Sequence, residues 1–217
     1  MATREYPIIS ALEIAEYFLF LADEDFTAIE PITPMKLQKL VYYAQGYSLA
    51  LHHQPLFRES IAAWKHGPVI QPLYYAYKRY GGGPVPAPQN YDPSQLSPRV
   101  TLLLGQVYGT YGRHGAWELS AMTHEEMPYR KTSSGAEISH ELMHEFFGQQ
   151  LRSAAALRRE ASEDLAMSEP EEFTSAERER LIAAAIATQA LEGYTLPREV
   201  AVDALDAALR KPLLDLR

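Results

Sequence analysis

One short segment of this chain carries a pattern that is typical of zinc enzymes. It reads His140-Glu141-Leu142-Met143-His144, and in such a pattern two histidines one helical turn apart bind the metal while the glutamate activates a water molecule. The segment directly follows Ser139, so it would form the first turn of a helix, and Glu160 or Glu163 would have to supply a third ligand. A zinc-dependent hydrolase using His140, Glu141 and His144 is therefore kept as an alternative, while an exposed helix face without a metal is the preferred interpretation.

Other residue types that perform chemistry are scarce or dispersed in the sequence. The chain has no cysteine, which excludes thiol nucleophiles, cysteine-bound zinc and disulfides and is typical of a reducing cytosol. The sequence contains no G-x-S-x-G elbow and neither of the common glycine-rich patterns that bind phosphate groups. We therefore expect no catalytic residues and no cofactor.

The elements that position these residues are mostly helices. A capping box at Ser10 and Glu13 opens a helix over residues 11–22, and Thr33-Pro34 opens a second helix. The second helix is apolar on nearly every face, which is typical of the centre of a bundle. Further helices are predicted over residues 70–77, 98–111, 116–123 and 139–160, and a turn over residues 127–129.

Residues 55–69 contain enough β-branched and aromatic side chains for a short β-hairpin. Gly67-Pro68 is expected to turn the chain out of this hairpin into the next helix. The predicted fold class is therefore mainly α: a helical bundle with a small β-hairpin element, followed by a C-terminal helical hairpin.

An acidic stretch that contains a proline, Ser168-Glu-Pro-Glu-Glu172, predicts a linker. We expect a helical domain over residues 1–165, the linker over residues 166–175 and the C-terminal helical hairpin over residues 176–217. In that hairpin, Ser175 caps one helix, Gly193 ends it and Pro197 begins the other.

The charge balance bears on the kind of partner. The 217 residues include 20 basic and 28 acidic side chains, which gives a net charge of −8. Such a surface repels nucleic acid and suits a basic protein partner. The longest apolar run, residues 181–187, is far shorter than the roughly 20 residues of a membrane span. The first residues also lack the pattern of a signal peptide, so we expect a cytoplasmic protein that contacts neither membranes nor nucleic acid.

Three blocks of sequence, taken together and in this order, resemble one protein family. They are Pro34-Met-Lys-Leu-Gln-Lys-Leu-Val-Tyr-Tyr-Ala-Gln-Gly46, then residues 55–69, then Leu73-Tyr-Tyr-Ala-Tyr-Lys-Arg-Tyr-Gly81. These blocks resemble the Panacea antitoxin domain, also called SocA-like or phage-associated GepA-like, over about residues 8–150. The residues expected to define the fold are Leu37, Leu40, Tyr42, Trp64, Gly67, Pro68 and Tyr74.

The resemblance implies an all-helical domain with a small β element that acts by binding. Members of this family are antitoxins that neutralise unrelated toxins, and one branch delivers its toxin to a protease as an adaptor. No catalytic residues come with the family, and the Trp64 to Pro68 segment is expected to form a packed turn. Three residues are candidates for a partner-binding surface, provided that their side chains are exposed: Lys36, Lys39 and Tyr43.

The C-terminal hairpin resembles a second class of antitoxin. Thr188-Gln-Ala-Leu-Glu192-Gly193 fits the [S/T]-x-x-x-E-[G/N] pattern of inhibitory helices that block Fic-type AMP-transferring toxins, and its surroundings are similar to antitoxins of the VbhA type. In such inhibitors the glutamate pairs with a toxin arginine that should hold the γ-phosphate of ATP. The resemblance implies inhibitory roles for Thr188, Glu192 and Gly193. The alternative is a hairpin that packs or dimerises.

These observations together predict an antitoxin that neutralises a cognate toxin by direct protein binding. The toxin class that the C-terminal pattern favours is a Fic-type AMP-transferase. Two alternatives stay open: an adaptor that delivers a toxin to a cellular protease, and the zinc hydrolase described above.

Overall fold

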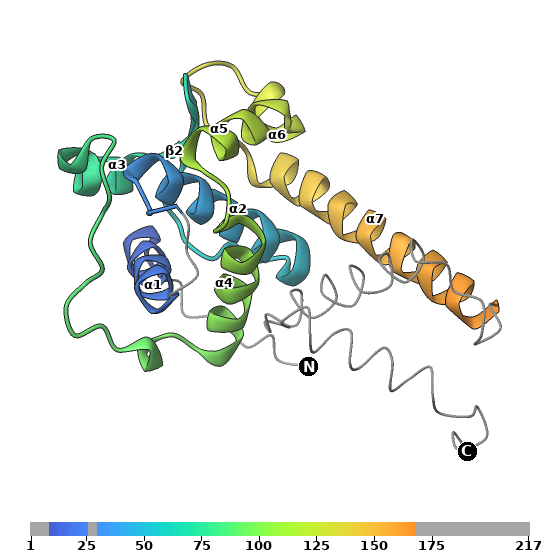
Figure 1. Cartoon of the computed structure of the whole chain (residues 1–217). Coiled ribbons are helices and arrows are strands. Elements are labelled where there is room, and N and C mark those ends of the chain that lie inside the picture. Colours follow the sequence, from blue (N-terminus) through green and yellow to red (C-terminus); the bar gives the residue numbers. More distant parts are fainter. Residues whose placement is uncertain (1–8, 26–29, 168–217) are drawn as a thin grey trace, which may run out of the picture. The chain divides into compact units, whose positions relative to one another are not determined.

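The computed structural model describes residues 9–25 and 30–167, and over these residues the chain is mainly helical (Figure 1). The α-helices are α1 (Ala11–Glu24), α2 (Pro34–His52), α3 (Gln71–Tyr77), α4 (Pro98–Tyr111), α5 (Ala116–Glu125), α6 (Met127–Arg130) and α7 (His140–Met167). Strands β1 (Ile61–Trp64) and β2 (Gly67–Ile70) form an antiparallel hairpin. The predicted mainly α bundle with a small hairpin is therefore confirmed over this part of the chain.

The chain divides into two compact units, Met1–Leu151 and Arg152–Arg217. The division falls within α7. The predicted helical hairpin at 176–217 and most of the predicted linker at 166–175 lie outside the described residues. The domain boundaries expected from the sequence therefore stay a prediction, and the fold below is that of the first unit.

Helix α2 lies at the centre of this unit, as its apolar pattern predicts (Figure 1). It contacts α1, α3, α4, α5 and β2. The Thr33 side chain caps its first turn by accepting a hydrogen bond from the backbone N–H of Lys36, and Pro34 occupies the first helical position. Its apolar residues Leu37 and Leu40 are fully buried. Because α2 contacts so many elements, its side chains decide where those elements lie.

The hairpin turns at Lys65 and His66, which corrects one expectation. Gly67 and Pro68 are residues of β2, where they pair with Trp64 and Ala63, whereas the sequence predicted that they turn the chain. The reason lies in the backbone of Gly67, which has a φ of +95°. Glycine adopts such a positive φ at little cost. This conformation lets β2 start directly after a two-residue turn.

Both edges of this small sheet are covered. Residues 135–138 run along β1, where Ala63 donates to the carbonyl of Ala136 and Ile138 donates to the carbonyl of Ile61. On the other edge, the Gln38 side chain of α2 forms hydrogen bonds with Ile70 of β2. A two-stranded hairpin is marginal on its own, so these contacts are what hold it in place.

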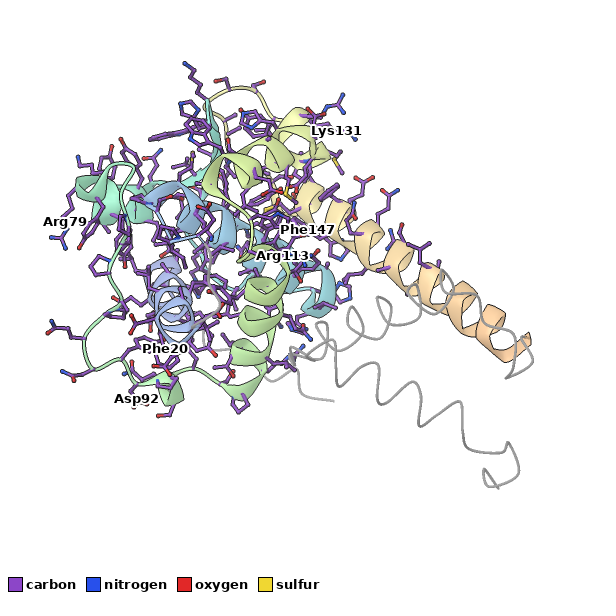
Figure 2. All side chains as sticks on the ribbon, viewed as in Figure 1. Phe20, Arg79, Asp92, Arg113, Lys131 and Phe147 are labelled. Atoms are coloured by element: carbon purple, nitrogen blue, oxygen red, sulfur yellow. The ribbon has the colours of Figure 1, made fainter. Side chains whose placement is uncertain are left out.

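Helix α7 begins where the sequence predicts. The Ser139 hydroxyl accepts a hydrogen bond from the backbone N–H of Leu142, and Phe147 on the next turns is buried against α2 (Figure 2). Met127–Arg130, predicted as a turn, forms the single-turn helix α6. None of the helices in residues 9–25 and 30–167 has the length and hydropathy needed to cross a membrane.

Candidate functional site

The polar residues of α2 lie inside the protein rather than on its surface. Lys36, Gln38, Lys39 and Gln45 are each at most 4% exposed. A buried polar group costs free energy unless it forms hydrogen bonds. The partners of these four side chains therefore show what the polar part of this sequence block does.

Two glutamines of α2 fix the backbone of neighbouring segments. Gln38 holds Ile70, because its Oε1 accepts from the Ile70 N–H at 2.8 Å and its Nε2 donates to the Ile70 carbonyl at 3.2 Å. Gln45 accepts from the N–H groups of Leu56 and Phe57 at 2.7 and 3.2 Å and donates to the Phe57 carbonyl at 3.0 Å. Helix α2 thereby sets the positions of β2 and of the segment that leads into β1.

A cluster of polar side chains lies where the hairpin packs on α2. It consists of one carboxylate, one lysine and two tyrosines. Glu126 accepts hydrogen bonds from the hydroxyls of Tyr42 at 3.0 Å and Tyr43 at 2.8 Å. The Lys39 ammonium donates to the carbonyl of Pro68 at 3.0 Å. Burial raises the pKa of Glu126 to about 7, against the opposing effects of the two tyrosines and of Lys39. Burial likewise lowers the pKa of Lys39 to about 7, against the attraction of Glu126.

These contacts correct the expectation for a partner surface on α2. Lys36, Lys39 and Tyr43 are at most 1% exposed, so none of the three is an exposed contact residue. The Lys36 ammonium donates to the carbonyl of Glu30 at 3.0 Å. The Tyr43 ring stacks on the ring of Tyr111 with 3.7 Å between centroids. All three side chains build the interior of the domain.

Gly67 lies against this buried cluster with no room for a side chain. A Cβ atom at this position would stand 2.7 Å from Thr123 Oγ1 and 2.8 Å from Lys39 Nζ. The close approach of the β2 backbone to α2 and α5 therefore requires glycine, in addition to the positive φ.

Side chains of α5 and α6 contact three consecutive carbonyl groups in the turn of the hairpin. The Tyr129 hydroxyl donates to the carbonyl of Trp64 at 2.8 Å, and the Ser120 hydroxyl donates to the carbonyl of His66 at 3.1 Å. Between them, His124 Nε2 lies 3.0 Å from the carbonyl oxygen of Lys65. The tip of the hairpin is thus anchored to α5 and α6.

Above this anchored turn, aromatic side chains are exposed. Tyr74 is 38% exposed, Tyr75 59% and Trp117 68%. The ring of Tyr74 contacts those of Trp64 and Tyr75, with centroids 5.2 and 5.5 Å apart, and His66 contacts Trp117 at 5.4 Å. We call this surface the hairpin face, and its residues are Trp64, His66, Tyr74, Tyr75 and Trp117.

A cavity of about 220 Å³ opens on the hairpin face. It lies between the first turn of α2, the hairpin and the end of α3. The residues that line it are Pro34, Met35, Gln38, Lys39, Trp64, Lys65, His66, Val69, Tyr74 and Gly81. Its wall is mainly apolar, so it suits an apolar side chain better than a charged ligand.

The two histidines of the predicted zinc motif contact different partners. His140 Nε2 lies 3.3 Å from Gln45 Nε2, whereas His144 Nε2 lies 2.9 Å from Nδ1 of His53. Glu141 is exposed at the start of α7. Among the side chains that the structure describes, those of residues 9–25 and 30–157, no group of three or more histidines, cysteines, aspartates or glutamates is placed to hold a metal ion. The third ligands expected from the sequence, Glu160 and Glu163, lie outside the described side chains, so the hydrolase alternative stays a prediction.

The predicted inhibitory residues Thr188, Glu192 and Gly193 lie outside the described residues. Their role stays a prediction from the sequence. Among the fold-defining residues, Tyr42 is fully buried and joins the Glu126 cluster, whereas Trp64 and Tyr74 line the cavity on the hairpin face.

Several residues of this region are not apparent from the sequence. Trp117 lies outside the buried side of α5, which consists of Leu119, Ser120 and Thr123. Because two of those three residues are polar, apolar spacing does not reveal which side of α5 faces inward. Glu126 likewise has no local signal, since its tyrosine partners lie more than 80 residues earlier in the chain.

Comparison with known proteins identifies this region. Residues 37–130 match the family described as "Antitoxin SocA-like, Panacea domain". The matched range is narrower than the 8–150 expected from the sequence, and it includes most of α2, the hairpin and helices α3 to α6. Searches of curated proteins and of solved structures gave no match. Residues 37–130 are therefore similar to the SocA-like Panacea domain, and no comparison supports the VbhA-like resemblance.

Proposed function

We propose that this chain is an antitoxin that neutralises a cognate toxin by direct protein binding. The observation that carries the proposal is the match of residues 37–130 to a SocA-like antitoxin domain. The structure supports a binding role in a further way. The polar residues of α2 hold backbone segments and one another, so they serve as a scaffold, while large aromatic side chains remain exposed on the hairpin face.

The toxin class is a separate part of the proposal. The pattern at Thr188, Glu192 and Gly193 favours a Fic-type AMP-transferase, because a carboxylate that clamps an active-site arginine prevents that arginine from holding a phosphate group. This part rests on the sequence of the C-terminal region. The expectation of a cytoplasmic protein likewise rests on the sequence.

The proposal is tested with the product of the gene next to the one that encodes this chain, which is taken as the candidate toxin. The test measures the growth of cells that express this product. The product is expressed alone, with the full chain, and with the full chain carrying Glu192→Ala, and the amount of the product is followed by immunoblot. We expect the product to arrest growth and the full chain to restore growth while the product persists. A product that arrests growth and is not counteracted by the full chain would contradict the antitoxin role.

The same cultures separate the modes of neutralisation. Loss of rescue with Glu192→Ala indicates the Fic mode, and unchanged rescue argues against it. If growth returns because the toxin disappears when both proteins are present, the chain is acting as a protease adaptor. A purified chain that hydrolyses a substrate and loses this activity with a chelator would instead support the zinc hydrolase that uses His140, Glu141 and His144.

A further inference from the structure

The hairpin face has the composition of a protein-binding surface. Tyr75 and Trp117 are 59% and 68% exposed, and burying side chains of this size provides much of the binding energy at protein interfaces. The chain has two tryptophans, Trp64 and Trp117, and both belong to this face. Contiguous aromatic exposure of this kind marks interaction sites on otherwise polar proteins.

The hairpin that carries Trp64 and His66 is also fixed by hydrogen bonds before any partner arrives. The carbonyls of Trp64 and His66 each accept a hydrogen bond from a side chain of α5 or α6, and β2 is fixed to α2 through Gln38. A surface that is ordered in the free protein loses little conformational entropy on binding. The backbone of the hairpin is therefore suited to docking without rearrangement.

The cavity sets the size of what can dock there. Its volume of about 220 Å³ exceeds the roughly 150 Å³ of an engineered apolar cavity that holds a benzene molecule. It therefore has room for one ring-sized apolar side chain, such as that of phenylalanine or leucine. Met35, Trp64 and Val69 supply apolar wall, which matches such a side chain.

Charge around the cavity differs from that of the whole chain. The hairpin and the segment after it, residues 61–80, contain three charged side chains, all of them basic, whereas the full chain carries −8. Lys65, Lys78 and Arg79 are exposed near the hairpin face, and Lys65 lines the cavity. Figure 2 shows Arg79 pointing outward beyond the ribbon at the edge of this unit. Such a surface attracts acidic groups.

We infer that the hairpin face is where the toxin docks, and that the docking segment of the toxin presents a ring-sized apolar side chain flanked by acidic residues. The inference rests on the proposed function and adds the place of contact and the chemistry of the partner. The net charge of the chain favours a basic partner, but the positive charge at this face selects acidic groups locally.

The two tryptophans allow the contact to be observed directly. The indole N–H groups of Trp64 and Trp117 give two signals in the spectrum of the uniformly ¹⁵N-labelled full chain. Addition of the unlabelled product of the neighbouring gene is expected to shift both indole signals. The backbone N–H of Leu102, on the exposed side of α4, serves as the control signal and should not move.

Substitutions of exposed residues provide a second test of the docking site. Tyr75→Ala, Trp117→Ala and Lys65→Glu should each raise the Kd for the same product at least about tenfold, as expected of central interface residues. Leu102→Ala is the matched apolar control. Arg58→Glu is the matched charge control. Arg58 is exposed and does not line the cavity. It follows Phe57, whose carbonyl is bound by Gln45, and Gln45 lies further along α2 than the residues that line the cavity. Both controls should change the Kd less than about twofold.

The outcomes separate this inference from the proposed function. If the full chain binds the product but the three variants bind equally well and the indole signals stay in place, the toxin docks elsewhere and the inference is wrong, while the antitoxin role stands. If the variants instead alter self-association of the full chain in sedimentation experiments, the face binds a second copy, which also overturns it. No binding of the product by the full chain would contradict both.

Discussion

Gly67 brings the backbone of the hairpin against the buried cluster of Lys39 and Thr123. Gly67→Ala places a Cβ atom against Thr123 and Lys39 at a backbone φ of +95°. Strain and overlap together should lower the free energy of unfolding by about 2–4 kcal/mol. Urea denaturation measures this change. Gly109→Ala on α4 is the control, because a Cβ atom added there would meet nothing within 4 Å, and it should raise the stability by about 0.5–1 kcal/mol.

Glu126 should make the stability of the domain depend on pH. Its pKa rises from 4.5 to about 7 on folding because of burial. The folded state therefore binds a proton more tightly than the unfolded state between these values. The contribution is fully present below pH 4.5 and is lost as the pH rises through about 7. Its full size is about 3 kcal/mol.

Glu126→Gln isolates this contribution. The amide keeps an acceptor for one tyrosine hydroxyl but cannot ionise. Denaturation of the wild type and the variant across this pH range should show the wild type losing stability relative to the variant as the pH rises. Parallel curves for the two proteins would show that Glu126 does not titrate in this range.

At the scale of elements, the contact between α2 and α7 depends on the absence of a side chain at Gly46. A Cβ atom at Gly46 would overlap the ring of Phe147, which is 1% exposed. Gly46→Ala should therefore push the start of α7 away from α2 and lower the stability by about 1–3 kcal/mol. Gly46→Ala combined with Phe147→Leu should recover part of the loss, which denaturation of both variants would measure. Equal losses for the two proteins would contradict this contact.

The helices could largely be predicted because their ends carry local signals. Ser10 and Glu13 form the expected capping box, and Thr33 with Pro34 begins α2 as expected. The position of the hairpin turn could not be predicted in the same way. It depends on how β2 approaches α2 and α5, which local sequence does not record.

The candidate site was less predictable than the helices. Gln38 and Gln45 are polar, and polar residues are mostly exposed in proteins. Both are nevertheless buried, because their side chains form hydrogen bonds with the backbone of distant segments. Lys39 is expected on the surface for the same reason, but it is buried and donates a hydrogen bond to the carbonyl of Pro68. The exposed position of Trp117 depends on which side of α5 packs inward, and its neighbours Ser120 and Thr123 conceal that side.

At the scale of the whole molecule, the charge near the hairpin face predicts a dependence of toxin binding on salt. Lys65, Lys78 and Arg79 are exposed, and their attraction to acidic groups is screened at high ionic strength. Raising the salt concentration to about 1 M, where the Debye length is about 3 Å, should raise the Kd. Lys65→Glu should show a weaker dependence on salt than Arg58→Glu. Equal dependence in the two variants would place the acidic contact elsewhere.

The central claim is that this chain neutralises a toxin by binding it directly. Calorimetric titration of the purified full chain with the product of the neighbouring gene tests this claim most directly. The account predicts saturable binding at a fixed ratio of the two proteins, with a Kd of about 1 µM or tighter, corresponding to about −8 kcal/mol. Rescue of growth by the full chain without detectable binding of the purified product would contradict it.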